Sequence, residues 1–120
     1  MYGLPRNFDP TLFVGRTIEL VSFTSNTVHL AFSGDRCSLT IESSFEHNPG
    51  VTGRERVHSE VPVVESGLMR LVGRSVAIAE VEGEGTLFLR FDDGQTLRLF
   101  DDSEEYESYR IDCNGLEIVV

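Results

Sequence analysis

The chain contains no Lys and no Trp, and it has only two Cys among its 120 residues. Without Lys, all ten strongly basic residues are Arg; they face twenty acidic residues, for a net charge of −10 at pH 7. Phosphate contacts need clustered cations, so this balance argues against binding to nucleic acid or to an anionic membrane. The charge instead favours a basic protein as partner.

Long apolar runs are also missing. Residues 1–6 lack the basic start and the apolar stretch of a signal peptide, and no run of 18 apolar residues occurs. We therefore expect a cytoplasmic protein that does not associate with membranes. Cys37 and Cys113 are too few for a disulfide framework and lack CxxC spacing. We expect two buried thiols, with a single bridge between them as the alternative.

The composition is nevertheless that of a folded domain. Hydrophobic residues make up 40% of the chain and include eight Phe. A chain of this length buries enough apolar surface to fold as a single domain over residues 1–120, with no metal or cofactor. Charge is uneven along it: residues 1–60 carry seven acids and five Arg (−2), and residues 61–120 carry thirteen acids and five Arg (−8).

An internal repeat with an offset of 58 residues is the strongest pattern, since Phe13–Ile18 matches Leu71–Val76. In both copies the apolar alternation shifts by one residue in the first strand, which predicts a bulge there. Two more alternating strands follow, so each copy reads as a three-stranded meander. A short helical turn precedes each copy, at 9–13 and at 66–71. The inward residues are expected to be Val28, Leu30, Phe32, Leu39 and Ile41 in the first copy and Leu87, Leu89, Phe91, Leu97 and Leu99 in the second.

The remaining segments complete a mainly β fold of about nine strands. Asn114-Gly115 predicts a C-terminal hairpin, and the connecting segment contains a turn at 48–50 and one strand near 54–61. We expect two pseudo-symmetric meanders plus the hairpin to form a small barrel or a two-sheet sandwich, because one sheet would leave its faces and edges unprotected. The expected divisions are repeat one at 9–45, the connecting segment at 46–65, repeat two at 66–109 and the hairpin at 109–120.

Three motifs carry a resemblance: L-x-x-L-V-G-R-x-V at 68–76, G-T-L-x-L-x-F-D-D-G at 85–94 and Y-E-x-Y at 106–109. With them the chain resembles a family of small uncharacterised bacterial proteins, a domain of unknown function. It has Tyr109 where that family usually has Trp. The resemblance implies no known activity, and no catalytic residue is carried over from it.

No constellation of side chains predicts catalysis. A metal or acid/base site would use His47 and His58, yet these are eleven residues apart, match no ligand spacing and fall in a segment expected to be solvated. His29 occupies an outward strand position, which indicates packing or surface. Neither Cys opens a helix, and Ser43-Ser44 lacks a nucleophile elbow. We predict a protein that is not an enzyme.

The densest feature is an acidic run from 101 to 109, which reads either as a solvated loop or as a recognition surface for a cationic partner. Its candidate partner-binding residues are Asp101, Asp102, Glu104, Glu105, Tyr106, Glu107 and Tyr109. We predict a non-enzymatic protein-binding module, such as an immunity or antitoxin-type protein that covers a basic partner. The alternatives are a small-molecule or metal-binding β-barrel with weak hydrolytic activity, and a structural homo-oligomer formed through the strand at 116–120.

Overall fold

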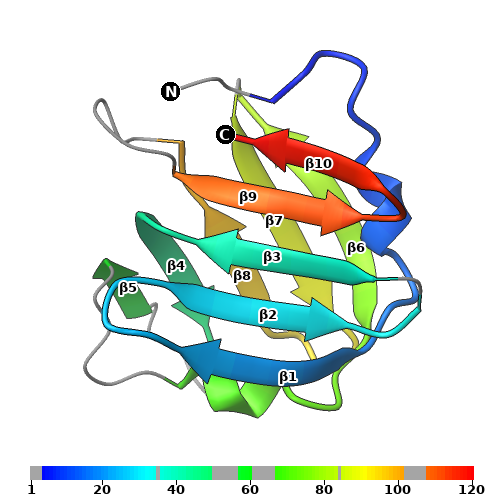
Figure 1. Cartoon of the computed structure of the whole chain (residues 1–120). Helices are drawn as coiled ribbons and strands as arrows, with labels where there is room; N and C mark the ends of the chain where they lie inside the picture. The colour runs from blue at the N-terminus through cyan, green and yellow to red at the C-terminus, as the bar shows by residue number, and fades with distance from the viewer. Residues whose placement is uncertain (1–3, 35, 50–56, 61–66, 84, 102–107) are drawn as a thin grey trace.

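The computed structural model describes residues 4–34, 36–49, 57–60, 67–83, 85–101 and 108–120, the side chains of 57–60 excepted. These residues form ten strands and two short 3₁₀ turns (Figure 1). The strands are β1 Ile18–Phe23, β2 Val28–Phe32, β3 Cys37–Ile41, β4 Ser44–Asn48, β5 Val57–Glu60, β6 Val76–Glu82, β7 Thr86–Phe91, β8 Thr96–Leu99, β9 Tyr109–Cys113 and β10 Leu116–Val119. No helix among the described residues is long and apolar enough to cross a membrane.

The strands form two antiparallel sheets that pack face to face. One sheet has the order β1-β2-β3-β9-β10 and the other β5-β4-β8-β7-β6. The strands of the β1-β2-β3-β9-β10 sheet, which is in front in Figure 1, cross those of the other sheet at a steep angle, as in orthogonally packed sandwiches. The expectation of a mainly β fold is confirmed as an open sandwich, and the barrel alternative is wrong because the sheets do not close.

The two meanders correspond strand for strand, β1-β2-β3 with β6-β7-β8. Each first strand has a register shift at its start, between Ile18 and Leu20 in β1 and between Val76 and Ile78 in β6, where bulges were predicted. Reciprocal hydrogen bonds join the two starts: the Ile18 N–H donates to Arg74 O and the Val76 N–H donates to Arg16 O, each at 2.9 Å. These contacts join the two sheets at the starts of β1 and β6.

Each meander is completed by the hairpin that follows the other one. The β4–β5 hairpin follows β3 in sequence but pairs with β8, and the β9–β10 hairpin follows β8 but pairs with β3. Strand β4 is the element that the sequence patterns missed, because its polar residues read as a loop. Its pairing with β8 makes it a strand. Asn114 and Gly115 have positive φ values of 55° and 82°, as the predicted type I′ turn requires.

Both 3₁₀ turns lie where they were expected. In η1 (Pro10–Phe13) the Asp9 carboxylate accepts a hydrogen bond of 3.0 Å from the Thr11 N–H and caps the turn. In η2 (Leu68–Leu71) both leucines are buried. Each turn packs against the first strand of the other meander, η1 on β6 and η2 on β1.

The core lies between the sheets. All ten predicted inward residues of the meanders are buried, and Phe13 from η1 packs its ring 5.3 Å from that of Phe32. Alternation with a period of two therefore identified the inner face of both units.

The expectation of two free thiols is wrong: Cys37 and Cys113 form a disulfide. They lie 76 residues apart in sequence. The pairing of β3 with β9 places them side by side, one residue beyond the Ser38–Asp112 pair. Both side chains belong to the buried core, so the bridge lies on the inner face of its sheet. This proximity depends on the pairing of β3 with β9, which the sequence patterns did not predict.

Candidate functional site

The structure describes the two ends of the acidic run and not its middle. Asp101 is half-buried and Ser108 is buried, and the Ser108 hydroxyl donates a hydrogen bond of 3.3 Å to the Asp101 carboxylate. The Ser108 N–H donates to Val120 O at 2.6 Å, which ties this end to the end of β10. The run therefore begins and ends at one place on the molecule. Asp102, Glu104, Glu105, Tyr106 and Glu107 lie outside the described residues.

Tyr109 is not a surface residue, so its prediction as a partner-binding anchor is wrong. Its side chain is 0% exposed, and its hydroxyl donates a hydrogen bond of 2.7 Å to Gly85 O. Burial, together with the nearby Asp101 carboxylate, raises the pKa of Tyr109 and keeps the phenol protonated. The physical reason is the alternation along β9, which turns positions 109, 111 and 113 to the core. That parity is readable in the sequence.

Acidic residues on the outer face of the second sheet are partly neutralised by Arg98. Its Nε donates to Glu82 Oε1 at 2.8 Å and its Nη1 donates to Glu46 Oε1 at 3.2 Å. Its guanidinium carbon lies 4.5 Å from the centre of the Phe88 ring, within cation–π range. The hydrogen bond with Glu82 is the main cause that raises the pKa of Arg98. This cluster holds β4, β6, β7 and β8 together, and each of its two carboxylates already has a guanidinium partner.

His47 is buried, which corrects the expectation of a solvated position. Its Nε2 donates a hydrogen bond of 2.9 Å to Gln95 Oε1, since the Gln95 amide nitrogen donates to Arg70 O at 3.0 Å and to Asp93 Oδ2 at 2.7 Å. Burial lowers the pKa of His47. The ring therefore serves as a neutral donor that joins β4 to Gln95, which in turn contacts Arg70 of η2, and that role does not suit a metal ligand.

The other histidines do not join it. His29 lies on the outer face of β2 with Nδ1 3.1 Å from the Thr40 hydroxyl, which agrees with the outward position expected for it. His58 belongs to β5 and pairs in register with Glu46, and its side chain lies outside the described residues. Among the residues described, no group of three or more His, Cys, Asp or Glu is arranged to hold a metal.

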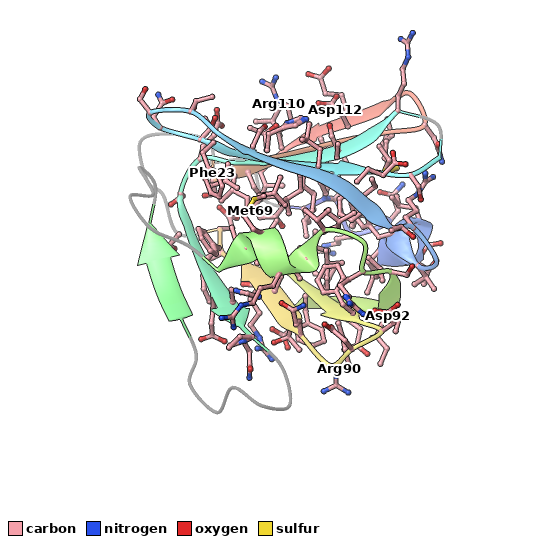
Figure 2. The ribbon with its side chains drawn as sticks, turned by 90° about the horizontal axis from the view of Figure 1, so that it is seen from below. Phe23, Met69, Arg90, Asp92, Arg110 and Asp112 are labelled. Carbon is pink, nitrogen blue, oxygen red and sulfur yellow. A yellow bond between two sulfur atoms is a disulfide. The ribbon has the colours of Figure 1, made fainter. Side chains whose placement is uncertain are left out.

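A groove of about 570 Å³ lies on the first sheet, between the β2–β3 turn and the β9–β10 hairpin. Ala31 and Ser38 line it together with Asp112 and Glu117. Figure 2 shows Asp112 pointing away from the sandwich on this face, whereas Arg90 points away on the opposite face. The sequence patterns missed this groove because its residues come from β2, β3, β9 and β10, which only the sheet order brings together.

Two acids in the groove face each other. Asp112 of β9 and Glu117 of β10 are direct cross-strand partners. Like charges in such a pair are destabilising. Within the described part of the chain, neither carboxylate makes a hydrogen bond or an ion pair. The structure thus places two uncompensated negative charges side by side at one concave surface.

The family of the chain follows from a comparison over nearly its full length. Residues 10–120 match the family of unknown function DUF6188. The chain belongs to DUF6188. This agrees with the resemblance to an uncharacterised domain family, and the match covers both meanders and both hairpins. No curated protein and no solved structure gives a significant match.

Uncompensated carboxylates also occur elsewhere on this DUF6188 domain. Beyond Asp112 and Glu117, three exposed acids make no side-chain hydrogen bond or ion pair with the described residues: Glu19, Glu80 and Asp92. Arg16, by contrast, is occupied inside the molecule, since it donates to Leu12 O, Ser33 O and Asn114 Oδ1. The described surface therefore offers several carboxylates to a cation.

Proposed function

We propose that this domain is a non-enzymatic protein-binding module for a basic partner. One concrete form is an immunity or antitoxin-type protein that covers a cationic active site, which is an analogy at the level of function class. The observation that carries the proposal is the surplus of carboxylates. Twenty acids face ten Arg in the sequence, and the five outward acids named above have no partner among the described residues.

Such a surface acts mainly on encounter. A negative field attracts a basic partner over about a Debye length and raises the association rate, while the fit of apolar and aromatic side chains determines how long the complex lasts. Within the acidic run, Tyr106 is the remaining candidate aromatic anchor, since Tyr109 is buried in the core. The acids of the run and Tyr106 are therefore assigned different kinetic roles.

Homo-oligomerisation through β10 is a second candidate. This strand is at the edge of its sheet and carries Leu116, whose side chain is 45% exposed. An unpaired edge strand can add a strand from another chain. Light scattering of the purified chain across a hundredfold range of concentration distinguishes this function from the first.

Affinity capture from the source cell tests the proposed function. The bait is the wild-type chain or a variant in which Asp101, Asp102, Glu104, Glu105 and Glu107 are changed to Asn or Gln. We expect the wild type to retain a basic protein that the variant binds more slowly, with a flatter dependence of association rate on salt. A Tyr106→Ala variant should instead dissociate faster.

The control removes three charges elsewhere, as Glu19→Gln with Glu80→Gln and Asp92→Asn, so its effect is compared with that of the run variant per charge removed. If the control slows association as much as the neutralised run does, net charge alone steers the partner. Identical partners and identical rates for the wild type and both charge variants would refute an electrostatic interface on this domain.

A further inference from the structure

The groove on the first sheet combines apolar and acidic groups in one concave surface. Its lining includes Ala31 and Leu116, and Asp112 and Glu117 lie beside each other across the β9–β10 ladder. A volume of about 570 Å³ is within the range of sites that hold a small group. The groove can therefore accommodate a side chain that is apolar along its stem and cationic at its tip.

The fold does not require a carboxylate at position 112. Ser38 pairs with Asp112 in one sheet, and Thr96, its counterpart 58 residues later, pairs with Asn48 in the other. Asn48 therefore occupies the pseudo-symmetric position with a neutral side chain. An acid that opposes Glu117, with no partner in the described residues, is unfavourable for folding unless a cation compensates it.

Arg36 lines the same groove without forming an ion pair with either acid in the described structure. Two carboxylates and one guanidinium leave the groove with a formal charge of −1. One added cation balances this charge. The five N–H donors of a guanidinium can satisfy two carboxylates at once, whereas an ammonium is a compact point charge.

We propose that this groove is the docking site for an arginine side chain of the basic protein partner. The proposal rests on the proposed function and adds to it the place and the chemistry of one contact. The guanidinium binds the Asp112 and Glu117 carboxylates, and the arginine stem packs against Ala31. The contact is distinct from the acidic run, which begins and ends at the Asp101–Ser108 hydrogen bond.

The test is an NMR titration of the whole chain with hexa-arginine, with hexa-citrulline as a neutral probe of similar shape. We expect saturable shifts of the Ser38, Asp112 and Glu117 amides with hexa-arginine alone. In the Asp112→Asn/Glu117→Gln variant the Kd should rise about tenfold, since two partly exposed ion pairs are lost. The Glu19→Gln/Glu80→Gln control, with the same charge, should keep the Kd within about twofold of wild type.

Misfolding does not confound this test, because removing the opposed charges should leave the variant at least as stable as the wild type, as thermal melts would show. Shifts confined to the neighbourhood of Asp101 and Ser108, or an unchanged Kd in the groove variant, would overturn the arginine site while leaving the proposed function in place. Equal binding of hexa-citrulline, or no binding anywhere, would count against both. Hexa-lysine that binds the groove as tightly as hexa-arginine would overturn the choice of a guanidinium.

Discussion

Loss of the disulfide between Cys37 and Cys113 should cost this domain a large part of its stability while leaving it folded. The bridge closes a loop of 76 residues and joins β3 of the first meander to the C-terminal hairpin. In the chain-entropy model a loop of that length removes about 15 cal/mol/K from the unfolded ensemble, or about 4.5 kcal/mol at 25 °C. A typical domain has 5–15 kcal/mol in total. The reduced chain is therefore expected to be marginal at 25 °C but folded.

The same free energy corresponds to a decrease in melting temperature. With an unfolding entropy of about 2.1 cal/mol/K per residue, 120 residues give about 250 cal/mol/K, so 4.5 kcal/mol corresponds to about 18 °C. The assay is thermal unfolding followed by circular dichroism on oxidised and on reduced chain. Because the bridge is buried, reduction should be carried out in denaturant before refolding in reductant.

The Cys37→Ala/Cys113→Ala variant is the control, and its melting temperature should not respond to reductant. It should melt somewhat below the reduced wild type, since it also loses two buried sulfur atoms. A reduced wild type that melts within about 2 °C of the oxidised chain would refute the loop-closure reasoning. It would mean that the unfolded chain already keeps these segments together.

Four further substitutions test the core and its polar contacts. Phe32→Ala and Phe91→Ala should each lower the free energy of unfolding by about 3–5 kcal/mol in urea titrations, because both rings are buried on equivalent strands. A loss under about 1 kcal/mol would contradict the buried placement of these rings. Tyr109→Phe should cost about 1–3 kcal/mol by leaving Gly85 O without its buried donor, and an unchanged midpoint would argue against that bond. The lowered pKa of His47 means that the unfolded chain takes up a proton first as the pH falls below about 6.5. Stability should therefore drop by up to about 1.4 kcal/mol between pH 6.5 and 5.5, and His47→Gln should remove that drop; an equal drop in the variant would assign it to other groups.

The acidic run and the groove show what the residue patterns could predict and what they could not. Tyr109 was assigned to a partner-binding surface because it follows five acids, although its parity with Ile111 and Cys113 marks it as inward. His47 was placed in a solvated loop because β4 is short and polar, and pairing with β8 carries it into the interior. The groove with Asp112 and Glu117 could not be found in the sequence, since it needs the positions of four strands. For the rest of the run, the middle lies outside the described residues, so its role stays a prediction.

The sequence by itself determined the local structure of this protein. Alternation with a period of two identified the inner faces of both meanders, the shift in phase predicted the bulges of β1 and β6, and Asn114-Gly115 specified the last turn. These features depend on neighbouring residues and on the geometry of a single strand or hairpin. Tertiary structure alone decided that each hairpin pairs with the other meander, and with it the disulfide, the burial of His47 and the groove that four strands line. The physical reason is that the partner of a hairpin strand depends on which sheet edge is left open when the two meanders pack together. Backbone hydrogen bonds do not decide between the edges, because they are much the same for every partner.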